Sequence, residues 1–152
     1  MILIAHRGNI TGPIPSLENE PSYLSDAINE GFDVEIDLWL INNQLYLGHD
    51  NPQYKIEYSW LKDRSTRLWI HCKHLESMCY LRKTDTNNKL NYFGHDNDDY
   101  VLTSQNFLFC KPVKKLDEHC ILVMPEFYNY EVSDENCYGI LTDYPKGYIN
   151  EN

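Results

Sequence analysis

Two histidines stand next to groups suited to chemistry on phosphate. His6 is followed by Arg7, and His49 is followed by Asp50. Two histidines on either side of a phosphorus atom suit general acid–base catalysis, because one takes the proton of the attacking group while the other protonates the leaving oxygen. A guanidinium offers a planar fork that binds two phosphate oxygens. These residue types predict a site that acts on a phosphoryl group, with His6 and His49 catalytic and Arg7 on the phosphate.

Apolar and acidic residues alternate in the stretch DVEIDL, residues 33–38. In a strand, this alternation places all three carboxylates on one face. Two carboxylates about 5 Å apart repel by roughly 3 kcal/mol at an effective dielectric constant near 20, so this face needs a counter-charge. A hard divalent cation held by Glu35 and Asp37 would supply it and polarise a phosphoryl group. We expect Asp33 to lie further down the strand, as a polar group outside the site.

These residues need elements that bring them together. The sequence predicts one α/β domain over residues 1–152 with two helices, over 21–30 and 75–83. It also predicts eight short strands, over Ile2–Ala5, Asp33–Leu40, Leu68–Cys72, Asn91–Phe93, Tyr100–Thr103, Phe107–Cys110, Ile121–Met124 and Tyr138–Leu141.

Short strands with some helical crossovers favour a small TIM-like (β/α) barrel whose outer helices are shortened or missing, although such barrels usually have about 200 or more residues. A β-rich α+β fold with an open sheet is the alternative. In a barrel, the carboxyl ends of the strands form the catalytic face. A turn at Asn42-Asn43 would make residues 44–47 a return strand beside Asp33–Leu40 and carry His49 back towards Asp37.

Composition narrows the class of partners. Thirteen basic and 23 acidic side chains give a net charge of −10, which disfavours long nucleic acids and anionic membrane surfaces. No apolar run reaches the length of about 18 residues that a membrane span needs. Five cysteines with no C-x-x-C pair indicate a reducing, cytoplasmic location. The sequence does not determine the oligomeric state.

Several motifs occur in a family order: IAHRG near the start, then a Glu-Asn pair, GFDVEIDLWL, LYLGHD, LWIHCK and finally GILTDYP. In this respect the chain resembles glycerophosphodiester phosphodiesterases and the wider phospholipase-C-like phosphodiesterase superfamily. The resemblance is dense over residues 2–52, returns at Leu68–Lys73 and closes at Tyr138–Pro145. It implies a TIM barrel, a divalent metal and cleavage of a small phosphodiester substrate.

The resemblance also implies roles for individual residues. His6 and His49 match the acid–base pair, and Arg7 matches the phosphate-binding arginine. Glu35 and Asp37 match the metal ligands of an E-x-D motif. Two further residues match the family: Glu18, in SLEN, as a residue supporting the site, and Lys73 as a second phosphate-binding residue.

The chain departs from the family at His71, which replaces a third metal carboxylate. An imidazole ligand makes the site softer, so Mn²⁺ or Zn²⁺ becomes possible beside the expected Mg²⁺ or Ca²⁺. We expect a neighbouring hydroxyl of the substrate to attack phosphorus and form a cyclic phosphate. If water does not open that ring, the enzyme is formally a lyase. The alternatives are a non-catalytic barrel that binds a phosphate ligand and a hydrolase of a nucleotide-derived phosphodiester.

Overall fold

The computed structural model describes residues 1–112, 116–132 and 137–149. Within them the chain is a mixed α/β protein with a ten-stranded sheet and three α-helices. In chain order the elements are β1 (Ile2–His6), α1 (Pro21–Asn29), β2 (Asp33–Ile41), β3 (Gln44–Leu47), β4 (Tyr54–Ile56), α2 (Tyr58–Asp63), β5 (Leu68–Cys72), α3 (Leu75–Thr84), β6 (Asn91–Phe93), β7 (Tyr100–Leu102), β8 (Leu108–Cys110), β9 (Cys120–Val123), the 3₁₀ helix η1 (Pro125–Tyr128), β10 (Gly139–Thr142) and the 3₁₀ helix η2 (Pro145–Tyr148).

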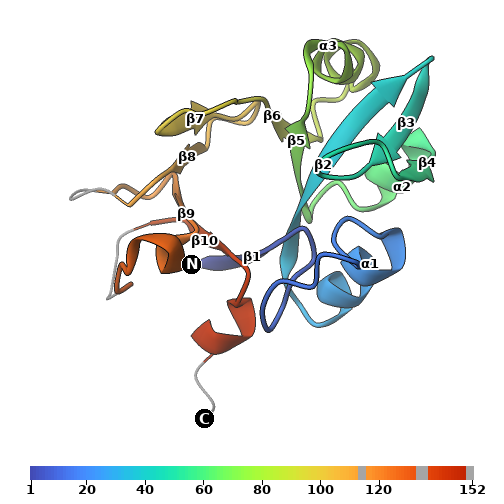
Figure 1. Cartoon of the computed structure of the whole chain (residues 1–152). Helices are drawn as coiled ribbons and strands as arrows, with labels where there is room; N and C mark the ends of the chain where they lie inside the picture. Colours follow the sequence, from blue (N-terminus) through green and yellow to red (C-terminus); the bar gives the residue numbers. More distant parts are fainter. Residues whose placement is uncertain (113–115, 133–136, 150–152) are drawn as a thin grey trace.

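Parallel strands form the centre of the sheet, in the order β6-β5-β2-β1-β10-β9-β8. The sheet curls so strongly that its two ends approach each other around a central space (Figure 1). β2 extends beyond its neighbours and there pairs with β3, which runs antiparallel to it and pairs in turn with β4. The return strand expected over residues 44–47 is thereby confirmed as β3.

Strand pairing does not close the expected barrel. Within the described residues, the ladder ends at β6 on one side and at β7 on the other. The strand predicted over Tyr100–Thr103 forms β7, but it runs antiparallel to β8 as one arm of a hairpin. A hairpin arm cannot serve as the eighth parallel strand of a barrel. The sheet is therefore curled and open.

Ser104, just after β7, bridges the seam between β6 and the β7–β8 hairpin. Its backbone N–H donates to the Tyr92 carbonyl oxygen at 2.8 Å, and the Tyr92 N–H donates to Ser104 Oγ at 3.0 Å. Ser104 Oγ donates in turn to the Leu90 carbonyl oxygen at 3.2 Å. The rings of Phe93 and Phe109 stack across the same seam, with their centroids 4.6 Å apart. One backbone hydrogen bond and several side-chain contacts thus join the two ends where the ladder does not.

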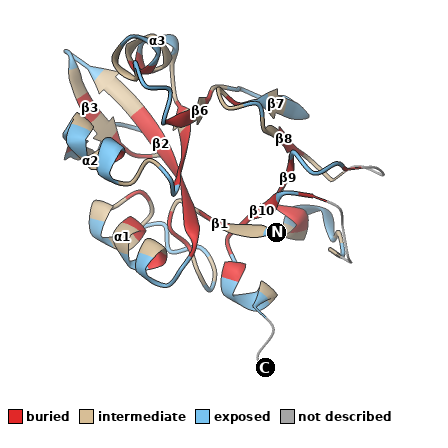
Figure 2. Ribbon diagram, turned by 180° about the vertical axis from the view of Figure 1, so that it is seen from behind, coloured by how far each residue is buried: buried red, intermediate tan, exposed pale blue. Residues whose placement is uncertain are grey.

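Helices cover one half of the curled sheet. α1, α3 and the β3–β4 hairpin lie outside β1, β2 and β5, whereas β8, β9 and β10 carry no α-helix (Figures 1 and 2). α1 begins at Pro21, whose fixed φ suits a first helical position. It buries Leu24 and Ala27 against the outward side chains of β2, such as Ile36. The acidic face of β2 is thereby left for the inside of the curl.

The predicted helices over 21–30 and 75–83 are confirmed as α1 and α3, with ends that differ by one residue. The structure adds the short elements α2 and β4 to those predicted. No helix in the described part of the chain combines the length and apolarity needed to cross a bilayer.

We predict that Ser104→Ala destabilises the protein, because it leaves the half-buried Tyr92 N–H without its Ser104 Oγ acceptor. The expected loss is about 1–3 kcal/mol of unfolding free energy, measured by urea denaturation. Amide hydrogen exchange should accelerate at Tyr92. Ser22→Ala is the matched control, because its hydroxyl makes only an exposed hydrogen bond with Glu20. Equal stability of the two variants would contradict the role of Ser104 at the seam.

Candidate active site

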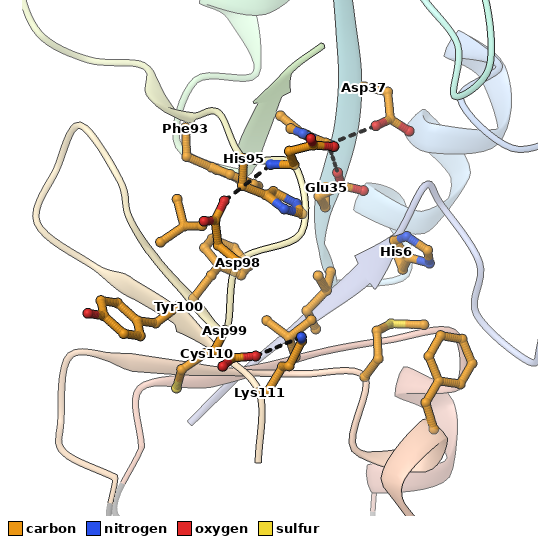
Figure 3. A pocket seen from close by; sticks show the side chains of 18 of the residues that line it. His6, Glu35, Asp37, Phe93, His95, Asp98, Asp99, Tyr100, Cys110 and Lys111 are labelled. Carbon is orange, nitrogen blue, oxygen red and sulfur yellow. Dashed lines mark hydrogen bonds and ion pairs between the residues drawn. The ribbon is translucent and has the colours of Figure 1, made fainter. Parts of the chain in front are cut away.

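The carboxyl ends of β1, β2 and β5 bring the predicted site residues to one end of the curl. In the parallel register, His6 of β1 is opposite Glu35 of β2, and Asp37 is opposite His71 of β5. They line a cavity of about 450 Å³ together with residues from β6 to β10. Figure 3 shows His6, Glu35 and Asp37 on one side of this cavity.

Asp37 is the centre of the cluster. Only 1% of its side chain is exposed, and each of its two carboxylate oxygens has two polar neighbours. Oδ1 lies 3.0 Å from His71 Nδ1 and 3.2 Å from Lys73 Nζ, while Oδ2 lies 2.9 Å from Asn19 Nδ2 and 3.2 Å from Arg7 Nε. Burial acts to raise the pKa of Asp37, but the His71 hydrogen bond and the charge of Lys73 outweigh burial and hold the pKa far below its usual range. Asp37 is therefore a buried carboxylate that stays ionised.

Asn19 fixes the orientation of Asp37 and was not singled out from the sequence. Its side chain donates to Asp37 Oδ2 and accepts from the Asp37 N–H, both at 2.9 Å. Asn19 is fully buried and has a left-handed backbone with φ 64°, a conformation that asparagine tolerates better than most residues. The signal was present in SLEN, where this asparagine follows Glu18 directly.

Glu35 is the least compensated group of the site. It is 3% exposed, and its Oε2 is buried without a hydrogen-bond partner. His71 Nδ1 lies 4.0 Å from its other oxygen. Burial and the nearby charge of Asp37 raise the pKa of Glu35. A buried carboxylate oxygen without a donor leaves room for a cation at this position.

His6 is held by a carboxylate on the opposite side from Glu35. Its Nδ1 lies 2.8 Å from Oδ1 of Asp143, which follows β10. Burial acts to lower the pKa of His6, but the hydrogen bond with Asp143 and the charge of Glu35 outweigh it and raise the pKa above its ordinary value. With Nδ1 engaged, Nε2 is the ring nitrogen that remains for a substrate.

Asp143 is itself held in place by two neighbours. Asn9 Nδ2 donates to its Oδ1 at 2.8 Å, and the Asp143 N–H donates to Glu126 Oε1 at 3.0 Å. Asn9 also donates to Glu18 at 3.0 Å, and Glu18 accepts from Arg7 Nη1 at 3.0 Å. Glu18 thus supports the site from behind Arg7, as expected. Arg7 has a left-handed φ of 54°. Its buried Nε forms an ion pair with Asp37 but makes no hydrogen bond.

His49 reaches the cavity from the loop after β3. The Gly48 N–H donates to the Asp37 carbonyl oxygen at 3.1 Å, and Trp39 Nε1 donates to the Gly48 carbonyl oxygen at 2.6 Å. Gly48 has φ 151°, and a Cβ there would collide with the Asn51 carbonyl oxygen, so the turn requires glycine. Partial burial and the charge of Arg7 lower the pKa of His49. Its Nδ1 lies 2.7 Å from Asp50.

An aromatic stack holds His71. Its ring lies parallel to Phe93, with the centroids 5.3 Å apart, and against His95, with the centroids 4.5 Å apart. His95 lines the cavity from the loop after β6. His95 is not among the residues predicted from the sequence. The parallel pairing of β6 with β5, which sets Phe93 opposite His71, brings its loop to the end of β5.

Within the described ranges, Glu35, Asp37 and His71 form the one group that could hold a metal, since each offers a ligand atom within 4.8 Å of the others. The unpartnered Glu35 Oε2 and two adjacent carboxylates fit a divalent cation. Asp33 does not belong to this group. It accepts from Trp69 Nε1 and pairs with Arg67, both at 3.0 Å, away from the cavity lining.

Seven of the eight predicted site residues line the cavity, and the eighth, Glu18, contacts Arg7. Their chemical roles remain predictions. Comparisons with protein-family models, with curated proteins and with solved structures found no match to this chain. The case for a function therefore rests on the residues around the cavity.

We predict that Asp143→Asn lowers the pKa of His6, because the variant removes the carboxylate that favours the imidazolium. The His6 ring signals, followed by ¹⁵N NMR across pH, should titrate at a lower pH than in the parent protein. Asp50→Asn is the control, because Asp50 contacts His49 and should leave the titration of His6 in place. An unchanged His6 pKa in Asp143→Asn would show that this contact does not govern its charge.

Proposed function

We propose that this chain is a metal-dependent phosphodiesterase resembling the glycerophosphodiester phosphodiesterases. The observation that carries the proposal is the gathering of His6, Arg7, Glu35, Asp37, His49, His71 and Lys73 around one cavity. Two imidazoles for proton transfer, two cationic side chains for the phosphate, and a carboxylate pair with a third imidazole for a metal are groups suited to the cleavage of a phosphodiester. The location of these residues around one cavity supports this function more strongly than their order in the sequence does.

Arg7 and Lys73 are the residues proposed to bind the phosphate. Both contact Asp37 and both line the cavity, with 19% and 15% of their side chains exposed. Their positive charges therefore sit at the edge of the cavity at fixed positions. Such fixed charges stabilise negative charge that develops on phosphate oxygens in the transition state.

Glu35, Asp37 and His71 are the residues proposed to hold the metal, with Mg²⁺ or Ca²⁺ favoured by the two carboxylates and Mn²⁺ or Zn²⁺ admitted by the imidazole. A bound divalent cation would polarise the phosphoryl group and lower the pKa of a coordinated hydroxyl. Glu35, whose Oε2 lacks a partner, gains the most from it.

The two histidines divide the proton transfers according to their surroundings. His49, with a lowered pKa, is neutral and takes the proton from the substrate's neighbouring hydroxyl. The oxygen bonds to phosphorus as the bond to the leaving oxygen breaks. His6, with a raised pKa, is protonated and gives its proton to that leaving oxygen. The products are an alcohol and a cyclic phosphate, which water can open after the two histidines exchange roles.

A second candidate function is binding of a phosphate ligand without turnover. Its support is the set of four polar neighbours around Asp37, which satisfies this carboxylate without any metal. The unpartnered Glu35 Oε2 favours the enzyme instead, because a pure phosphate-binding site has no use for an uncompensated buried acid.

We also propose that the curled sheet is a reduced TIM-like barrel, in which a hairpin and side-chain contacts replace the last parallel pairing. The seven parallel strands and the site at their carboxyl ends support this relation. Cys72, Cys79, Cys110 and Cys120 are free thiols, which suits the cytoplasmic location expected from the sequence.

We predict that His6→Ala and His49→Ala each lower kcat by about 10²–10⁴-fold on the best phosphodiester, because each removes one proton transfer. The measurement is ³¹P NMR of the products from a phosphodiester panel, with Mg²⁺, Mn²⁺, Ca²⁺ or EDTA. It distinguishes cyclic from open products. His119→Ala is the control, since His119 is exposed outside the cavity lining. Full activity of the double variant would overturn the proposal, and the absence of any metal-dependent turnover would favour the binding function.

We predict that Glu35→Gln weakens Mn²⁺ binding by about tenfold or more, because it removes a charged ligand while keeping the side-chain shape. Titration calorimetry and Mn²⁺-induced broadening of the His71 NMR signals measure binding independently of turnover. Asp99→Asn is the matched control, because it removes an acid at the cavity rim that is paired with Lys111. Equal Mn²⁺ affinity in Glu35→Gln and Asp99→Asn would remove Glu35 from the metal site.

A further inference from the structure

The wall of the cavity that faces the polar cluster is apolar. It comes from β7 to β10 and η1 and includes Val101, Phe109, Val123, Met124 and Leu141. Figure 3 shows the two sides separately, with Glu35 and Asp37 on one side and the β7–β8 hairpin on the other. The site proposed above uses only the polar side.

The size of the cavity exceeds what the phosphate site needs. At about 450 Å³, it falls within the range of about 300–1,000 Å³ typical of pockets that enclose a whole small molecule. A phosphate placed among Arg7, Lys73 and the carboxylates leaves the apolar side unfilled. One ester group of a bound phosphodiester must therefore lie against this wall.

Three exposed aromatic side chains stand at the rim on the same side. Phe127 is 69% exposed, Tyr100 71% and Tyr128 49%, and all three line the cavity. Phe127 and Tyr128 belong to η1, which is bounded by left-handed residues at Met124 and Asn129. The Phe127 N–H donates to the Met124 carbonyl oxygen at 3.0 Å. The short helix η1 thereby keeps the Phe127 and Tyr128 rings exposed to solvent beside the apolar wall of the cavity.

Charge on this side disfavours an anionic ester group. Lys111 is the basic residue at the rim, and its Nζ is paired with Asp99 at 2.8 Å. Asp96 and Asp98 line the cavity from the same β6–β7 loop. Among the described residues, this rim has no unpaired basic side chain for a second phosphate or a carboxylate.

We infer that the substrate's second ester group is an uncharged hydrophobic alcohol, aliphatic or aromatic, which seats against Val123, Met124 and Leu141 and is covered at the rim by Phe127. The inference rests on the proposed function, because the phosphate site determines which part of the ligand reaches the apolar wall. It names the class of substrate: a monoanionic phosphodiester with one hydrophobic ester group.

The test begins with binding, measured by calorimetry in the presence of Mg²⁺. The probes are ethyl methyl phosphate and ethyl 3,3-dimethylbutyl phosphate, which lack the hydroxyl needed for the proposed cyclisation. Burying several additional carbon atoms should tighten binding by about tenfold or more, since each buried methylene contributes up to about fourfold. Equal affinity for the two probes would overturn the inference.

The choline ester is the third probe, because it matches the dimethylbutyl ester in shape and differs by one positive charge. We expect it to bind no more tightly than the neutral ester. Tighter binding of the choline ester would overturn the inference and assign the aromatic rim to a cation instead.

Phe127→Ser should reduce the preference for the dimethylbutyl probe over the methyl probe at least threefold. Its exposed side chain makes the variant unlike a core substitution, and Tyr128→Ser provides a second test on the same short helix. Leu75→Ser is the matched control: this leucine is 72% exposed on α3, away from the cavity. An unchanged preference in both η1 variants would contradict the placement of the hydrophobic group.

Turnover of the corresponding 2-hydroxyethyl esters separates the two proposals. If the dimethylbutyl probe binds more tightly but none of the esters is cleaved, the proposed function fails and the hydrophobic subsite stands. If all the esters are cleaved with equal kcat/KM and the probes bind equally, the function stands and the subsite fails.

Discussion

The buried, ionised carboxylate of Asp37 determines how the polar residues at the carboxyl ends of the central strands are arranged. Burying the charge of Asp37 is costly unless it is paired and hydrogen-bonded. The chain meets that requirement from four directions, through residues after β1, before α1, on β5 and after β5. Two of these partners are themselves held in place, Arg7 by Glu18 and His71 by Phe93. The polar end of the curled sheet is thus one connected network, and its geometry follows from keeping Asp37 charged.

Much of this network is visible in the sequence because a strand has a period of two residues. The alternation in residues 33–38 predicts correctly that Ile36 and its apolar neighbours pack outside while Glu35 and Asp37 face the other way. Asp33 stands apart, as expected from its position further down the strand, and there it binds Arg67 and Trp69. Parallel pairing then brings the ends of β1, β2 and β5 to one edge. The alternation in residues 33–38 and the parallel pairing of neighbouring strands therefore account for most of the candidate site.

The rest depends on contacts that no local pattern encodes. Asn19 reaches the site from the loop between β1 and α1, while Asp143 and His95 follow β10 and β6, whose places beside β1 and β5 depend on long-range strand pairing. The open seam has the same origin. Tyr100–Leu102 has the composition of a strand, but composition does not tell a hairpin arm from a parallel barrel strand. The structure thereby corrects the closed barrel while keeping the strands that predicted it.

The hydrogen bonds of Ser104 also protect one edge of the sheet from pairing with another copy of the chain. A strand at the end of a sheet presents backbone groups that can pair with another chain, and proteins protect such edges in several ways. On β6, both backbone groups of Tyr92 are already occupied by Ser104. The loop that carries Ser104 thereby blocks edge-to-edge pairing at β6. This edge is exposed because the barrel is not closed there.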